Sequence, residues 1–191
     1  MGFVLLAVLA LLVFWVIGAY NGLIALKNQV ANAWKQIDVQ LKRRHDLIPN
    51  LVNAVKGAMD FEKSTLEAVI SARNKAVSAQ GVAATAKAEG ELTAALGRLF
   101  ALTEAYPQLK ATTNIAQLQE ELASTENKVA FARQLYNDVA TQFNTKQAQF
   151  PTNLIAGIAG ATPAELWQIE NDAERAVPTV DFSGRPPAPP T

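Results

Sequence analysis

The sequence contains no cysteine and only one histidine, His45. The absence of cysteine excludes a disulfide scaffold, thiolate metal sites, cysteine nucleophiles and a lipid-modified cysteine. A single histidine excludes any metal site that needs two imidazoles. Aromatic residues make up only 7% of the chain, and 17 basic residues balance 17 acidic ones. A neutral chain produces no overall field that attracts nucleic acid, so we expect no nucleic-acid partner.

Charge is also missing from the start of the chain, where the first charged side chain is Lys27. Residues 3–20 carry no charge and would span ~27 Å as a helix, and extension to Leu26 reaches ~36 Å. Either length crosses a hydrocarbon core of ~30 Å. Cleaved signal peptides begin with a basic region, which is lacking here. We therefore expect a transmembrane anchor over residues 1–26 that contacts the lipid bilayer through residues 3–26.

Basic residues follow the apolar segment but do not precede it. Lys27, Lys35 and the run Lys42-Arg43-Arg44 all lie on its C-terminal side. The positive-inside rule then places the following domain in the cytoplasm and the short N-terminus outside. The reverse orientation stays open, because only two of these charges lie close to the predicted anchor.

After Asn21 the chain has the apolar periodicity of an all-α fold, an elongated antiparallel helical bundle. The first apolar stripe carries Arg44 in the same register as its other members. Pro49 falls inside this stripe and should kink the helix or end a turn, because proline lacks the amide donor. Whether residues 61–78 continue this helix or turn back near Gly57 stays open. The apolar members of the stripe are Trp34, Ile37, Leu41, Ile48, Leu51 and Val55.

Two further helices are predicted. One extends from Val82 to Tyr106 and is limited by Pro107. The other is longer, ~54 Å, and should pack lengthwise against its neighbours. Its stripe consists of Ile115, Leu118, Leu122, Thr125, Val129, Ala132, Tyr136, Val139, Phe143, Lys146 and Phe150.

Alanine dominates residues 79–95, so this part of the bundle has little apolar area to bury. The longest helix also outruns the helix before it. Part of its stripe therefore needs cover from the first helix, from the connector at residues 153–160 or from another copy of the chain. Because anchoring concentrates copies in the membrane plane, we expect a homo-oligomer.

The chain changes character after Phe150-Pro151. Residues 153–160 form an apolar connector in which Gly157 and Gly160 allow tight folding against the bundle. Thr162, Pro163 and Glu165 then have the pattern of a helix N-terminus. This pattern predicts a short helix to about Ala176, with Leu166, Trp167 and Ile169 on its inner side.

Residues 177–182 should be extended, and the proline-rich residues 183–191 should form a disordered or polyproline tail. The chain is thus expected to comprise an anchor (1–26), a cytosolic helical bundle (27–182) and a tail (183–191).

Several motifs resemble the LemA family. The longest comprises Tyr20-Asn21-x-Leu23-x-x-Leu26 and Ala33-Trp34-x-x-Ile37-Asp38-Val39-Gln40-Leu41-Lys42-Arg43-Arg44-x-Asp46-Leu47-Ile48-Pro49-Asn50-Leu51-Val52. Shorter matches are Val55-Lys56-Gly57, Glu62, Ala72-Arg73, Phe143-Asn144, Phe150-Pro151-x-Asn153-Leu154-Ile155-Ala156-Gly157 and Pro178-x-Val180-x-Phe182. The resemblance implies a bacterial inner-membrane protein with one N-terminal span and a cytosolic helical bundle, and it implies no enzyme activity.

Two positions depart from the family pattern. Ala58 stands where the family usually has an aromatic residue, and Phe61 stands where it has a histidine. If the family uses that histidine, this chain lacks the corresponding function. Relatives associated with magnetosomes, which are membrane-bounded compartments, keep a membrane-organising role open.

The densest charged motif is Lys42-Arg43-Arg44-His45-Asp46. It could bind an acidic headgroup or a phosphate, but its spacing favours structural ion pairs, because Lys42 has i,i+4 partners in Asp38 and Asp46. Arg44 lies on the apolar stripe, so we expect a carboxylate on a facing helix to pair with it. His45 is interpreted as a solvated or bundle-rim residue.

Acidic residues occur in two groups, Glu62 with Glu67, and Glu120 and Glu121 with Glu126. A di-metal helical bundle needs inward Glu-x-x-His pairs, which the sequence lacks. We therefore predict no catalytic, cofactor-binding or metal-binding residue and no cofactor.

Three functional hypotheses follow. The first is a non-enzymatic membrane-anchored scaffold that acts through helical self-association. The second is an adaptor in which the bundle or residues 183–191 recruit an unidentified cytosolic protein. The third, which is less favoured, is a ligand-binding or enzymatic bundle with a polar cavity.

The orientation can be tested with a reporter that is active only outside the cytoplasm. Fused after Thr191, it should be silent in bacterial cells, whereas the same reporter fused before Met1 should be active. A strong signal from the C-terminal fusion would reverse the predicted orientation.

Overall fold

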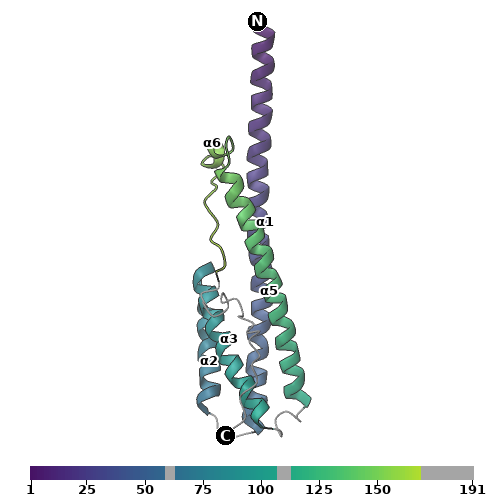
Figure 1. Ribbon diagram of the computed structural model, residues 1–191, viewed down its shortest axis with the longest axis vertical. Coiled ribbons are helices and arrows are strands. Elements are labelled where there is room, and N and C mark those ends of the chain that lie inside the picture. Colours follow the sequence, from purple (N-terminus) through teal and green to yellow (C-terminus); the bar gives the residue numbers. More distant parts are fainter. Residues whose placement is uncertain (59–62, 107–112, 169–191) are drawn as a thin grey trace, which may run out of the picture.

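The computed structural model describes residues 1–58, 63–106 and 113–168. These residues form α1 (Gly2–Ala58), α2 (Lys63–Ser78), α3 (Val82–Ala105), α5 (Thr113–Ala148) and the one-turn helix α6 (Asn153–Ala156). The four long helices alternate in direction, so they make an antiparallel bundle (Figure 1). Within the described ranges there is no β-strand. The predicted fold class, an all-α elongated antiparallel bundle after a long apolar helix, is confirmed.

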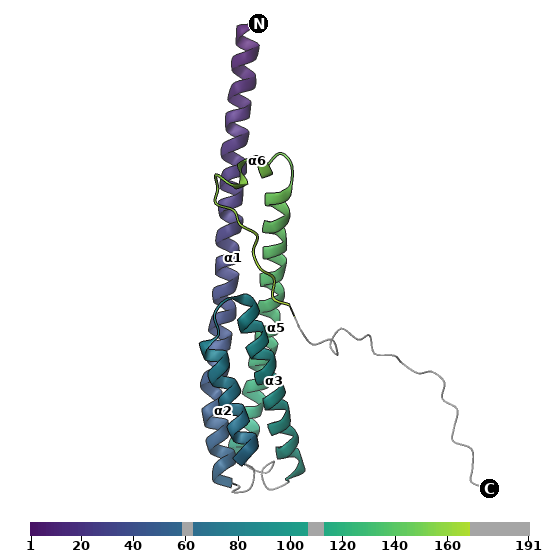
Figure 2. The ribbon, with the colours of Figure 1, turned by 90° about the vertical axis from the view of Figure 1, so that its left-hand side faces the viewer.

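The molecule narrows in steps along its long axis. At one end α1, α2, α3 and α5 pack together, and further along only α1 and α5 continue side by side (Figures 1 and 2). Beyond α6 only α1 remains, and residues 1–15 are almost wholly exposed. The 57 residues of α1 extend over ~85 Å without a break near residue 26. The predicted anchor and the first bundle helix are therefore one continuous rod.

α1 continues through Pro49, so this proline does not end the helix. Proline has no amide hydrogen to donate to the carbonyl of His45, four residues earlier. Arg73 of α2 supplies a replacement, because its Nε donates to the His45 carbonyl oxygen at 3.3 Å. A side chain of the neighbouring helix thus satisfies the acceptor that Pro49 leaves open.

The open question about residues 61–78 is resolved by α2, which turns back and packs against α1 and α3. Phe61 itself lies outside the described residues. The turn into α3 depends on Gly81, whose φ of 83° is a conformation that residues with a Cβ rarely adopt. α3 ends at Ala105, one residue before the predicted limit.

The core consists of three apolar clusters along the axis. The cluster furthest from the N-terminus joins all four long helices and includes Ile48, Leu51, Val55, Val69, Leu92, Leu99, Ile115 and Leu122. The middle cluster contains Ala33, Ile37, Leu41, Val129, Ala132, Tyr136, Ala140 and Trp167. The cluster next to the exposed part of α1 contains Leu23, Phe143, Ile155 and Ala159.

The buried face of α5 follows the predicted stripe as far as Tyr136, and beyond it only Phe143 of the predicted residues is buried. Ala140 and Gln147 are buried, whereas Lys146 and Phe150 are exposed. A strict alternation of three and four averages 3.5 residues per turn, while an α-helix has 3.6, so the two patterns diverge by ~20° per heptad. Towards the end of the helix the buried position is therefore the residue after the predicted one, Ala140 instead of Val139 and Gln147 instead of Lys146.

Residues 161–168 are not helical, so the helix predicted to begin at Thr162 is wrong within the described residues. Its continuation to Ala176, and the predictions for Ile169, residues 177–182 and residues 183–191, lie outside them. Residues 161–168, here called the strap, run back along α5 (Figure 2).

Two asparagine side chains of α5 hold the strap. Asn144 accepts from the Ala164 amide at 2.7 Å and donates to the Ala164 carbonyl at 2.8 Å. Asn137 makes the same pair with Trp167, at 2.8 and 3.0 Å. From Ala164 to Trp167 an extended chain advances ~10 Å, and from Asn144 back to Asn137 the helix advances ~10.5 Å. The two pairs can therefore form at the same time. These amide pairs satisfy backbone groups that a helix would otherwise satisfy.

The strap ends in a buried aromatic contact. The ring centroid of Trp167 lies 6.1 Å from that of Trp34, and Arg133 lies 5.7 Å above the Trp167 ring. Tyr136 donates its hydroxyl to the Glu165 carbonyl at 2.7 Å. Burial, and secondarily the Glu165 carboxylate, raises the pKa of Tyr136 above its ordinary value. The predicted burial of Trp167 is therefore confirmed, although in a strap rather than a helix.

The asparagine pairs should contribute measurably to stability. Asn144→Ala leaves the donor and acceptor of Ala164 unpaired, so we expect a loss of about 1–3 kcal/mol in the free energy of unfolding. Asn114→Ala, at an exposed position of the same helix, is the matched control. Denaturant unfolding of the detergent-solubilised protein, followed by circular dichroism, measures both. Equal small losses would show that the strap is not held by Asn144.

Candidate functional site

The centre of the bundle contains a buried guanidinium. Arg44 of α1 is only 3% exposed. Its Nη1 lies 2.8 Å from Glu89 Oε2, and its Nη2 lies 2.8 Å from Glu126 Oε2. Nη2 also donates to Thr93 Oγ1 at 2.8 Å. The prediction that a carboxylate on a facing helix pairs with Arg44 is confirmed, and two helices, α3 and α5, each supply one.

His45 belongs to the same network, so the prediction of a solvated or bundle-rim residue is wrong. It is buried, and its Nε2 lies 2.6 Å from Glu89 Oε1. The two oxygens of Glu89 therefore face two different side chains of α1. Together with the Arg73 bond to the His45 carbonyl, the network joins all four long helices.

Neither Glu89 nor Thr93 is among the residues that the sequence singles out as partners. The signal for Glu89 was its register, since it continues the steps of three and four that run through the buried residues of α3. An acidic residue in a buried register position requires a cation opposite, and Arg44 is the matching one on α1. The buried residues of α3 are Thr85, Ala88, Glu89, Leu92, Ala95, Leu96, Leu99 and Thr103.

The remaining charges of the basic motif lie on the outer face of α1. Lys42 and Arg43 are exposed, and Lys42 Nζ lies 2.6 Å from Asp46 Oδ2. This hydrogen bond from Lys42 lowers the pKa of Asp46. Of the two spacing-matched carboxylates, the structure thus pairs Lys42 with Asp46, while partial burial raises the pKa of Asp38. The motif is divided between core and surface, so it forms no single anion-binding patch.

A cavity of about 480 Å³ opens beside the network. Its lining includes Arg44, Lys87, Glu91, Arg133 and Trp167. Arg44 is already neutralised by its two carboxylates, so its charge is not available to a ligand. Among the described residues, no cluster of three His, Asp or Glu side chains could hold a metal ion. Glu62, a member of the acidic groups considered above, lies outside these residues.

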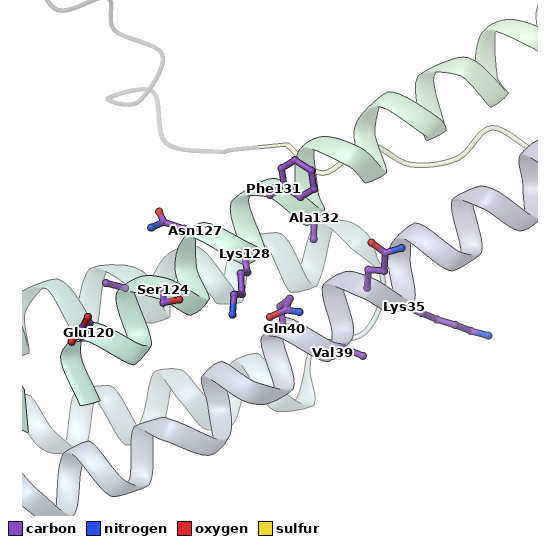
Figure 3. A pocket seen from close by; sticks show the side chains of 11 residues that line it. Lys35, Val39, Gln40, Glu120, Ser124, Asn127, Lys128, Phe131 and Ala132 are labelled. Atoms are coloured by element: carbon purple, nitrogen blue, oxygen red, sulfur yellow. The ribbon is translucent and has the colours of Figure 1, made fainter. Parts of the chain in front are cut away.

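A larger groove of about 840 Å³ lies between α1 and α5 (Figure 3). Two large apolar side chains border it, Val39 of α1 at 64% exposure and Phe131 of α5 at 71%. Gln40 and Lys128 point into the space between the two helices in Figure 3. The Oε1 atom of Gln40 is shielded from solvent and has no hydrogen-bond partner. The groove therefore combines an exposed apolar rim with an unsatisfied polar group.

One helix in the described part of the chain, α1, is long and apolar enough to cross a membrane, and its most apolar window is not buried by the rest of the protein. The sequence therefore describes an antiparallel helical bundle that continues a single candidate membrane span. The model of the LemA family matches residues 33–182, which is most of the bundle. This chain belongs to the LemA family.

Curated relatives agree with this assignment. The chain is 30% identical over 158 residues to Protein LemA of Metamycoplasma hominis, a match that covers 81% of this chain and 72% of the relative. It is 25% identical over 175 residues to Magnetosome protein MamQ 2 of Paramagnetospirillum magneticum, and 24% over 174 residues to Magnetosome protein MamQ of Magnetospirillum gryphiswaldense. These two matches cover 78% of this chain and 64% of each magnetosome protein. None of these names is that of an enzyme.

The buried network gives a direct test of its structural role. Arg44→Ala leaves Glu89 buried without its cation, and breaking a buried pair costs about 3–5 kcal/mol. The exposed neighbour Arg43→Ala should cost far less. Chemical denaturation of both variants in the same detergent gives the comparison. Small and equal effects would contradict the role assigned to Arg44.

Proposed function

We propose that this protein is a non-enzymatic, membrane-anchored scaffold that pairs with further copies of itself through the groove between α1 and α5. The observation that carries the proposal is the exposure of Val39 and Phe131 on the two helices that border this groove. Large apolar side chains gathered in one groove favour a protein partner over water. α1, α6 and the strap already cover the end of α5, so a shortage of core does not by itself require a second copy.

A shared membrane restricts how two copies can meet. Because both anchors cross the bilayer in the same direction, a two-fold axis must run along the helices rather than across them. Residues at one height in the first copy then meet residues at the same height in the second. Val39 and Phe131 border the same groove, so a two-fold axis through the groove brings each of them near its own counterpart in the second copy.

One polar group of the lining supports such a contact. Lys35, Lys128 and Glu120 also border the groove, at different heights along the two helices. The unsatisfied Gln40 Oε1 shows that the polar groups of the groove are not fully paired within one copy.

The names of the relatives fit this proposal without extending it. Two of them are magnetosome proteins by name, and a role in organising a membrane suits an anchored protein that self-associates. The adaptor hypothesis depends largely on residues 183–191, which lie outside the described residues, and it stays a prediction.

A second candidate function is favoured by one observation, the cavity of about 480 Å³. A small anionic ligand entering it would meet Lys87 and Arg133, although Glu91 and Glu126 also line the cavity. We rank this function lower, because the buried Arg44 already has two carboxylate partners. Isothermal titration calorimetry with inorganic phosphate or citrate tests this function. Binding that is lost in Arg133→Ala would place ligand binding above the scaffold role.

The scaffold proposal can be tested by cross-linking, because the chain contains no cysteine. Phe131→Cys in native membranes should give a disulfide-linked dimer on mild oxidation, since a two-fold contact brings the two thiols together. Val77→Cys is the matched control, an exposed apolar position on α2. Mass photometry of the unmodified protein in nanodiscs provides an independent reading. A clean monomer over a wide concentration range, with no dimer from Phe131→Cys, would overturn the proposal.

A further inference from the structure

Residues 149–160, here called the tip, form the end of the bundle from which the exposed part of α1 projects (Figures 1 and 2). Three large apolar side chains of the tip face outward. Phe150 is 80% exposed, Leu154 68% and Ile158 78%. Their spacing of four residues places them along one side of a chain that turns helically. We propose that the tip is inserted into the interface of the lipid bilayer beside α1, with these three side chains in contact with lipid.

The position of the tip along α1 supports this proposal. Ile155 and Ala159 pack with Leu23, and partly buried residues of the same cluster extend from Val16 to Val30 on α1. A span over residues 3–20 covers ~27 Å of the ~30 Å hydrocarbon core, and the interfacial region adds ~5–8 Å on each side. The tip therefore lies at the level where the helix leaves the hydrocarbon.

The backbone of the tip is suited to a poorly hydrated environment. Amide groups there already donate to carbonyls of the same segment, so few would need water as a partner. These bonds run from Asn153 to Gln149, Leu154 to Pro151, Ile155 to Thr152, Ala159 to Ile155, Gly160 to Gly157 and Ala161 to Ala156, at 2.9–3.1 Å. Without them, insertion of the backbone would be costly.

Charge distribution points the same way. Residues 147–164 contain no charged side chain, as residues 1–26 contain none. No Asp or Glu precedes Asp38, and none lies in residues 139–164. The two charged side chains nearest the tip are both lysines, Lys27 and Lys146. Lysines at this level attract anionic headgroups, whereas carboxylates would be repelled.

Lys27 also fixes the tip to α1. Its Nζ donates to the Gly160 carbonyl at 3.0 Å, although 133 residues separate the two in the chain. Gly160 adopts a φ of +58°, in which a residue with a Cβ is strained. The first charged side chain after the apolar run thus holds the end of the tip, and it keeps three lipid-facing side chains at a defined height.

Single cysteines introduced into the cysteine-free, full-length chain can measure the depth of the tip. An environment-sensitive fluorophore on Ile158→Cys is compared with one on Leu12→Cys, within the span, and one on Phe131→Cys, an exposed apolar position on the bundle. The protein is reconstituted at one copy per nanodisc, which removes contacts with other copies. Nanodiscs contain either phosphatidylcholine alone or phosphatidylcholine with phosphatidylglycerol, each with and without nitroxide-labelled lipid.

We expect the Ile158 probe to show blue-shifted emission and loss of emission with nitroxide lipid, as the Leu12 probe does, while the Phe131 probe shows neither. Quenching at Ile158 should be stronger with phosphatidylglycerol present. The inference rests on the membrane anchoring of α1, which the Leu12 probe reads separately. If Leu12 is quenched while Ile158 behaves like Phe131, the tip is outside the lipid and the inference is overturned. Self-association at the groove would be unaffected by that result.

Discussion

The arrangement of the bundle depends on one buried cation. Removing a guanidinium from water costs several kcal/mol unless its donors and its charge are met, and Arg44 meets both requirements only where α3 and α5 present Glu89 and Glu126. A slip of α3 or α5 by one turn, 5.4 Å, would take one of these two carboxylates away from Arg44. Apolar contacts between alanine-rich helices tolerate such slips more readily, because small side chains interlock weakly. The ion pairs therefore specify register, and the apolar clusters on either side supply most of the buried area.

The same position divides the bundle into two kinds of packing. On the side away from the N-terminus, four helices bury leucine, isoleucine and valine in the usual manner of a bundle. On the other side α2 is absent and only the first turns of α3 take part, through Val82 and Ala86, so the α1–α5 pair is completed by aromatic rings and by the strap. Two helices alone would leave Trp34 and Tyr136 open to water. The asparagine-held strap thus takes the place of two missing helices at the cost of only eight residues.

Much of this structure could be predicted from the sequence, and the exceptions have physical causes. The register of Arg44 predicted a buried ion pair, because a charged residue in an apolar stripe requires a partner. His45 was misjudged because its partner, Glu89, is 44 residues away and is matched to it only by packing. The helix expected at Thr162 does not form because Asn144 and Asn137 offer the backbone a better set of hydrogen bonds. A spacing of seven residues between two asparagines on one helix was the available signal. The exposure of the tip's apolar side chains could not be predicted, because neighbouring apolar residues of the same segment are buried in the core.

The continuity of α1 has a mechanical consequence. Once α1 crosses a bilayer, it has no hinge at which the bundle could reorient, since Pro49 lies deep within the packed region and its open carbonyl is held by Arg73. A span that is too long for a thin membrane tilts to hide its apolar length, commonly by ~20°. The part of α1 beyond residue 26 is ~48 Å long, so such a tilt carries its far end sideways by ~16 Å. A tilt of the span would therefore be carried, enlarged by this length, to the distal end of the bundle.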